Sequence, residues 1–183
     1  MVALKTERRV YLWRIWPQSN PKNASVTVTL GEVLGLLKAG YDQGEAEIYL
    51  SEDGRALAAD ADPAEKNPKN RVYIADMKED KDTITFLINR GDINAADPAF
   101  IDVKTKDVEI VSPGDDQTQG WSAHLVIAKN KKADPQTWRG CYERMPHASS
   151  SYAEQLINTI LERRALLAGT YTYNAVVKRA GKT

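Results

Sequence analysis

Short runs in which apolar residues alternate with polar ones recur along this chain, and turn residues rather than helical segments separate most of them. In residues 83–89 every second side chain is apolar, and residues 121–127 repeat the pattern. A period of two is typical of a strand with one buried face. Consecutive parallel strands need a long crossover connection, so strands joined by short turns pair antiparallel. We therefore expect a largely antiparallel sheet.

Other segments also have strand composition, rich in β-branched and aromatic residues. We predict further strands at residues 9–16, 25–28, 45–50, 55–58, 71–75, 108–111 and 171–179. Turn residues at 52–54 and 78–82 predict two hairpins, which pair 45–50 with 55–58 and 71–75 with 83–89. The stretch 92–102 is polar and contains proline, so we expect it to be irregular.

Two segments have helical periodicity instead. Thr29 and Glu32 have the spacing of a capping box, apolar residues follow at helical intervals, and Gly40 lies where a C-terminal cap is expected. A second helix is predicted to start at Ser150 or Ser151, with Glu154 completing the same spacing after Ser151. The fold class is therefore α+β, with seven to nine short strands in a mostly antiparallel sheet and two principal helices on one face.

Length and composition favour a single domain over residues 1–183, because a chain of this size can bury an adequate core by itself. The structured run near the C-terminus indicates that the chain is the N-terminal domain of a longer protein. The 25 basic and 25 acidic residues cancel, so a charged partner would have to meet a local patch. The lone Cys141, the charged N-terminus and the absence of a long apolar stretch predict a cytoplasmic protein without a membrane partner.

No catalytic signature is present. The chain lacks a G-x-G-x-x-G, Walker or G-x-S-x-G motif and any paired His or Cys metal ligands, so we predict no cofactor and no metal. Cys141 and His147 are six residues apart across Pro146, without a motif that would place them as nucleophile and base. We expect a protein that is not an enzyme.

An enzyme acting on phosphodiesters is the alternative. It would use some of Glu45, Glu47, Asp92 and His124 with a divalent metal, and it predicts that these side chains converge on one cleft. His124, in a strand, is the best single candidate for a general base. Acidic alternation on a strand is also the ordinary pattern of a solvated face.

The start of the second helix is a candidate phosphate site. Its free N–H groups lie beside hydroxyl side chains and two cationic candidates. The candidate phosphate-binding residues are Arg144, His147, Ser149 and Ser150. Plain helix capping explains the same serines without a ligand.

A second candidate is a basic and aromatic surface at the two ends of the chain. If the first and last strands lie side by side, their edge would suit a nucleic-acid backbone and unstacked bases. The candidate nucleic-acid-binding residues are Arg8, Arg9, Trp13, Arg14, Lys178 and Arg179. The alternative is that Trp13 belongs to the core and the terminal lysines are solvated.

The order of segments also resembles known proteins. A strand pair at 84–90 and 122–127 surrounds Asp97-Pro98-Ala99-Phe100 and precedes a serine-capped helix. This arrangement resembles uncharacterised bacterial and prophage proteins, including Rex-type phage-exclusion proteins. The resemblance covers most of the chain and implies a prokaryotic, intracellular role in phage defence or mobile-element biology, with DNA as a partner.

Taken together, these observations predict a non-catalytic binding module whose partner is nucleic acid or another protein. Besides the metal-dependent enzyme, a structural dimerisation protein is the third hypothesis. It would form a homo-oligomer through an exposed strand edge at residues 10–16 or 171–177.

Overall fold

The computed structural model describes residues 8–19, 29–58, 60–129, 137–167 and 173–179. This part of the chain contains nine strands, two α-helices and a short 3-10 helix, Pro63–Glu65, which confirms the α+β class. The helices are α1 (Leu30–Asp42) and α2 (Ser150–Leu167). The strands are β1 (Val10–Ser19), β2 (Glu47–Tyr49), β3 (Arg71–Glu79), β4 (Thr83–Gly91), β5 (Ala99–Ile101), β6 (Val108–Ile110), β7 (Gly120–Ala128), β8 (Trp138–Glu143) and β9 (Tyr173–Arg179).

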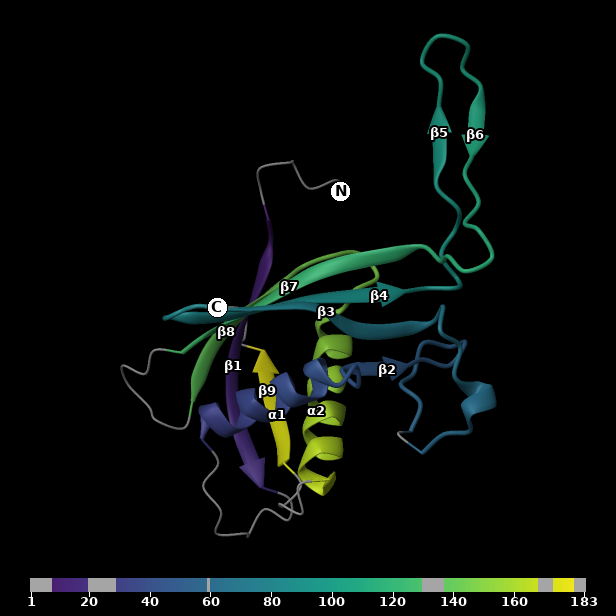
Figure 1. The fold of residues 1–183 in the computed structure, drawn as a ribbon. Coiled ribbons are helices and arrows are strands. Elements are labelled where there is room, and N and C mark those ends of the chain that lie inside the picture. Colours follow the sequence, from purple (N-terminus) through teal and green to yellow (C-terminus); the bar gives the residue numbers. More distant parts are fainter. Residues whose placement is uncertain (1–7, 20–28, 59, 130–136, 168–172, 180–183) are drawn as a thin grey trace.

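Seven of these strands form one sheet in the order β2-β3-β4-β7-β8-β1-β9, and every neighbouring pair is antiparallel. The sheet curls, and α1 and α2 lie together on one of its faces (Figure 1). We call this the inner face and the opposite one the outer face. The remaining two strands, β5 and β6, form a separate hairpin that projects from the junction of β4 and β7 (Figure 1).

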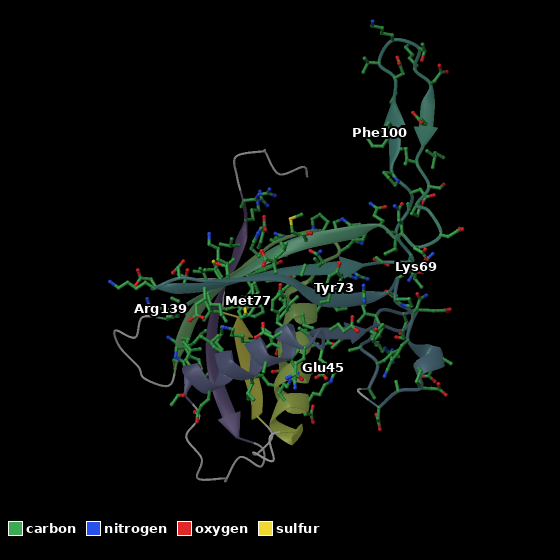
Figure 2. The ribbon with its side chains drawn as sticks, in the orientation of Figure 1. Glu45, Lys69, Tyr73, Met77, Phe100 and Arg139 are labelled. Atoms are coloured by element: carbon green, nitrogen blue, oxygen red, sulfur yellow. The ribbon has the colours of Figure 1, made fainter. Side chains whose placement is uncertain are left out.

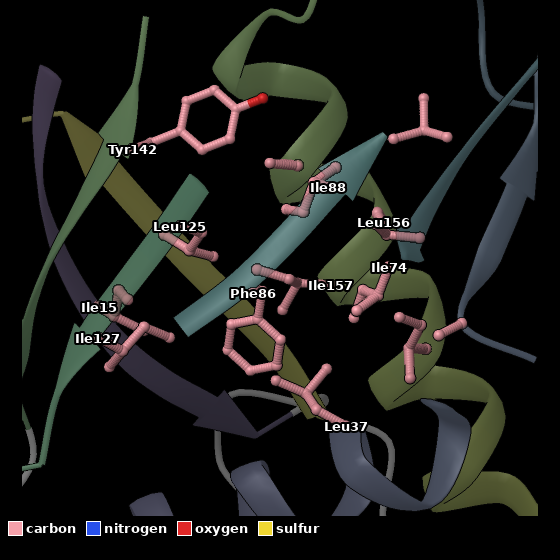
Figure 3. Close-up of a cluster of buried hydrophobic side chains, with 14 of the residues drawn as sticks. Ile15, Leu37, Ile74, Phe86, Ile88, Leu125, Ile127, Tyr142, Leu156 and Ile157 are labelled. Carbon is pink, nitrogen blue, oxygen red and sulfur yellow. The ribbon is translucent and has the colours of Figure 1, made fainter. Parts of the chain in front are cut away.

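The core lies between the inner face and the two helices. Phe86 and Ile88 on β4, Leu125 on β7 and Leu37 on α1 are buried in it, with Leu156 on α2 (Figure 3). The alternation in β4 and β7 therefore has the predicted cause, since one face of each strand packs against helices and the other does not.

Helix α1 starts as predicted. The Thr29 side chain accepts a hydrogen bond from the Glu32 N–H, and the Glu32 carboxylate accepts one from the Thr29 N–H. The predicted end at Gly40 is wrong, because the helix continues to Asp42. Gly40 is instead a contact point between the helices, since a Cβ there would lie 2.7 Å from Cγ2 of Ile160 on α2.

Other predictions need correction. Residues 55–58 do not form a return strand, and only an isolated bridge from Leu50 to Ala56 is present, because β2 pairs with β3 instead. β8 was not predicted, and it occupies a central position between β7 and β1. The segment 10–16 is not an edge, because β1 pairs with β8 and β9, whereas β9 is the last strand of the sheet. The strand predicted at 25–28 lies outside the described residues.

In the described part of the chain, neither helix combines the length and the apolar composition that spanning a membrane requires.

The packing of α1 gives a test of the core. Leu37 is fully buried, whereas its neighbour Leu36 is only half-buried. Leu37→Ala is expected to lower the free energy of unfolding by about 2–5 kcal/mol, because it removes apolar contacts and leaves a cavity. Leu36→Ala is the matched control, with the same change in helix propensity, and should cost less than half as much. Urea unfolding of both variants measures the difference, and equal losses would contradict this packing.

Candidate functional site

The hairpin β5–β6 forms the tip of a long excursion between β4 and β7, which we call the arm (residues 93–119). Ala99 pairs with Ile110, Phe100 with Glu109 and Ile101 with Val108. The arm rises from one end of the sheet, on the side away from the helices (Figure 1). Every residue of β5 and β6 is exposed, so the hairpin packs against nothing else in the described structure.

One face of the hairpin is entirely apolar. Side chains directly opposite each other in a strand pair lie on the same face. Ala99, Ile101, Val108 and Ile110 therefore form one continuous surface, and the last three are 60–66% exposed. A two-stranded ribbon is only marginally stable by itself in water, and exposed apolar patches usually mark interaction sites. This apolar face is thus the strongest candidate binding surface of the molecule.

The arm also carries a charge. Six acidic residues and two lysines lie in it, a net charge of −4 in a chain whose total is zero. The acidic residues are Asp97, Asp102, Asp107, Glu109, Asp115 and Asp116. A negative field of this kind repels phosphate backbones and favours a basic or apolar partner surface.

The base of the arm is fixed by a buried ion pair. The Arg90 guanidinium lies 2.9 Å from the Asp92 carboxylate, and both side chains are less than 10% exposed. Arg90 also donates to the His147 carbonyl and lies over the Tyr152 ring, at 4.5 Å from its centroid. These contacts connect the point where the arm leaves β4 to the start of α2. We call this cluster the arm root.

His147 lies at the edge of the arm root. Its ring stacks on Trp121 with centroids 4.4 Å apart, and its Nδ1 is 3.8 Å from the Asp92 carboxylate. Its φ of 58° lies in the left-handed region, which is uncommon for residues other than glycine. The stack, together with the Arg90 contact to the His147 carbonyl, holds this backbone in place.

A pocket of about 570 Å³ adjoins the arm at the same end of the sheet. Tyr73, Asn89 and Ser122 are among its lining residues, with Lys69 and Asp116 contributing charges of opposite sign. Asn89 donates to the Tyr73 hydroxyl and accepts from Ser122. The uncharged polar groups of this pocket thus largely satisfy one another. Arg71 and Arg90 also line it, but they are paired with Glu47 and Asp92, so the opposite charges of Lys69 and Asp116 favour neither an anion nor a cation.

The outer face has ion pairs elsewhere too. Arg71 on β3 lies 2.9 Å from Glu47 on β2, while Glu143 on β8 lies between Arg8 and His124, at 3.2 and 2.9 Å. Burial alone would raise the pKa of the Glu143 carboxyl, but the hydrogen bonds from His124 and the charge of Arg8 outweigh it and lower that pKa.

Near the β9 edge, the described side chains of Arg14 and Arg139 have no such ion pair. Arg14 on β1 is directly opposite Arg139 on β8 and, on its other side, opposite Lys178 on β9. We call these three positions the basic row. Like charges directly opposite each other in a sheet are destabilising. Arg14 and Arg139 are exposed, with Leu12 and Val10 exposed beside them on the outer face. This part of the outer face is therefore both basic and apolar.

The predicted phosphate residues have different partners in the structure. Ser149 and Ser150 lie at the start of α2, where Ser150 is buried and the Ser149 hydroxyl is 2.5 Å from that of Ser151. The Arg144 guanidinium instead lies 5.9 Å from the Tyr11 ring, and His147 stacks on Trp121. The serines by themselves have the arrangement of a helix start.

The predicted nucleic-acid residues are brought together only in part. The first and last strands do lie side by side, with Trp13 opposite Arg179. Trp13, however, is buried in the core and stacks on Tyr142, so its ring is not available to a base. Arg8 is paired with Glu143, and Arg9 and Arg14 are exposed. The side chains of Lys178 and Arg179 lie outside the described residues.

The four residues of the enzyme hypothesis do not converge. Each has a different partner: Glu45 pairs with Arg164, Glu47 with Arg71, Asp92 with Arg90 and His124 with Glu143. Among the residues described, no three His, Cys, Asp or Glu side chains are close enough to hold a metal ion. Cys141 lies on the outer face of β8, opposite Leu12, so it is not paired with His147.

Sequence reasoning missed the arm itself. The segment 92–102 was expected to be irregular, although Ala99–Ile101 forms β5. A signal was present in the sequence. The apolar residues Phe100, Ile101 and Val103 lie close together, and only a short turn separates them from the predicted strand at 108–111. Comparison with known proteins adds nothing to this site, since no protein-family model, curated protein or solved structure matches the chain.

The arm root predicts a large cost for losing Arg90. Arg90→Ala leaves the buried Asp92 carboxylate without its cation, so unfolding free energy should fall by about 3–5 kcal/mol. The matched control is Arg71→Ala on the adjacent strand, whose partly exposed ion pair with Glu47 should cost about 1 kcal/mol or less. Chemical denaturation measures both, and a small loss for Arg90→Ala would show that the root is not a buried charge pair.

The lowered pKa of Glu143 predicts a dependence of stability on pH. Because this pKa is below its ordinary value of 4.5, the ionised carboxylate stabilises the fold above that pH, and the contribution is lost as pH falls through the folded pKa. Glu143→Gln should therefore be less stable than the parent at pH 7 and show a flatter decline on acidification. Urea unfolding between about pH 7 and pH 3 tests this. Parallel curves for parent and variant would contradict it.

Proposed function

We propose that the chain is a non-catalytic binding module that engages a protein partner through the β5–β6 arm. The observation that carries this proposal is the continuous apolar face of Ala99, Ile101, Val108 and Ile110, exposed on an arm that projects from a fixed root. Covering such a face gains hydrophobic free energy without disturbing the core. The role in phage defence that the resemblance implies would suit such a module.

A protein partner fits the arm better than nucleic acid does. The arm has a net charge of −4, and the candidate stacking residue Trp13 is buried. Nucleic-acid affinity depends largely on neutralising phosphates with cations, and the two lysines of this arm are outnumbered by six acidic residues. Unpaired edges on both sides of the hairpin also allow a partner strand to add to it.

Site-specific photo-crosslinking in cells tests this proposal. A photoreactive residue at Val108 should give one discrete crosslinked product, because the face around it is covered by a specific partner. The same residue at Ala64, on the exposed 3-10 helix away from the arm, is the matched control and should give none. Adding Ile101→Asp and Ile110→Asp should remove the product, since charges would then be buried at the contact.

The proposal fails if Val108 and Ala64 give the same products, or if the aspartate substitutions change nothing. The nucleic-acid alternative has its own measurement, which is binding of single- and double-stranded DNA and RNA at about 50 mM salt, where phosphate contacts are strongest. We expect no measurable affinity. Tight, salt-dependent binding would favour the nucleic-acid hypothesis instead.

A further inference from the structure

The hairpin of the arm exposes apolar side chains on both of its faces. Residues paired across two strands share a face, and neighbours along a strand lie on opposite faces. Phe100 and Glu109 pair with each other, so they lie on the side opposite to the apolar face. We call this second side the mixed face. Phe100 is 60% exposed there, as much as Val108 is on the apolar face.

This exposure is concentrated in one place. Single exposed hydrophobic residues are common on protein surfaces and need no explanation. In the described part of the chain nine large apolar side chains are exposed, and six of them lie between residues 100 and 111. Figure 2 shows Phe100 far out on the arm, away from Tyr73 on the sheet, and every residue of β5 and β6 is exposed. The described body of the molecule therefore covers neither face of the hairpin.

Side-chain hydrogen bonds hold the hairpin in shape at both of its ends. At the tip, the Asp102 carboxylate accepts hydrogen bonds from the N–H groups of Lys104 and Thr105, at 2.7 and 2.9 Å. At the base, the Ser112 hydroxyl donates to the Asp97 carboxylate at 2.7 Å. A segment that is already ordered loses less conformational entropy when it binds. The hairpin is thus suited to enter a partner as a preformed ribbon.

We infer that the hairpin is inserted into a cleft of its protein partner, which covers both faces at once. One wall of this cleft is apolar and lies against the apolar face, and the other carries a lysine or arginine and lies against the mixed face. The inference rests on the function proposed above. A ribbon of two strands has no concave surface of its own, so a partner that covers both of its faces must supply the concavity.

The mixed face determines the chemistry of the second wall. Enclosing this face removes the Glu109 carboxylate from water, which costs free energy unless a cation pairs with it. Phe100 lies directly opposite Glu109, and the face of an aromatic ring also attracts cations, so one cation can contact both side chains. A partner that covered only the apolar face would leave the Phe100 ring in water and lose the gain from burying it.

Photo-crosslinking from the two faces separates a cleft from a flat surface. A photoreactive phenylalanine analogue replaces Phe100 in one sample and Val108 in another, each in the full chain in cells. A cleft predicts the same crosslinked protein from both positions. Mass spectrometry of that product should find a lysine or arginine in the partner peptide attached at position 100, and apolar residues in the peptide attached at position 108.

Substitutions on the mixed face, measured by the crosslink at Val108, test the second wall. Glu109→Lys should lower the yield at least about tenfold, because a cation would then face a cation. Asp107→Lys is the matched control, since it makes the same charge change outside the paired residues of the hairpin and should leave most of the product. Phe100→Ala should lower the yield at least about tenfold, since a buried aromatic anchor is lost. Urea unfolding should show the parent's stability in all three variants, because the hairpin packs against nothing else in the described structure.

The outcomes separate this inference from the proposed function. A product from Val108 that Phe100→Ala leaves unchanged, or different proteins from the two positions, would show that no cleft encloses the hairpin, while the proposed function would stand. Equal yields for Glu109→Lys and Asp107→Lys would overturn the charged wall. Lipid attached at both positions would assign the hairpin to a membrane, and no product at Val108 would reject the proposed function together with the cleft.

Discussion

The structure depends on one constraint, which is that two helices can cover only one face of a seven-stranded sheet. Both helices lie on the inner face, where Leu37 and Leu156 pack against Phe86 and Leu125. Burial there provides most of the favourable free energy of folding. The outer face is not covered by the helices, so strands such as β4 and β7 alternate between buried apolar residues and more polar outward ones. That alternation is the pattern from which the antiparallel sheet was predicted.

The uncovered face is balanced in most places and unbalanced in one. Glu47 neutralises Arg71, and Glu143 joins Arg8 and His124. Surface pairs of this kind contribute little stability, but they leave no net charge that would attract a partner. Around the basic row, no ion pair is seen among the side chains that the structure describes, and the positions opposite Arg14 are themselves basic.

The sequence predicted those parts of the fold that local patterns determine. The capping box of α1 and the hairpin of β3 and β4 follow from spacing within a few residues. Helix α2 begins at Ser150, one of the two predicted positions, but the predicted capping box of Ser151 and Glu154 is wrong, because both residues lie inside the helix. The end of α1 was not predicted correctly. Gly40 allows Ile160 of α2 to pack closely against α1, and this contact between residues far apart in the sequence has no local pattern. β8 was missed because Gly140 and Cys141 interrupt the composition that is typical of a strand. Its strand conformation depends on pairing with the neighbouring strands β7 and β1. Trp13 was offered as a surface residue for the same reason, since only the assembled sheet shows which face it occupies.

The arm shows why a neutral composition says little about binding. A net charge of zero excludes a uniform field, but the distribution of charge along the fold decides what a surface attracts. The acidic residues of 93–119 are held away from the body by the arm root, and the ion pair of Arg90 and Asp92 fixes that separation by joining the arm to α2. Were the root loose, the arm could collapse onto its own sheet and cover its apolar face. The root joins the base of the arm to the body, and the apolar face of the hairpin is exposed beyond it. Exposed apolar patches usually mark interaction sites, so this face is the part of the surface that composition alone could not indicate.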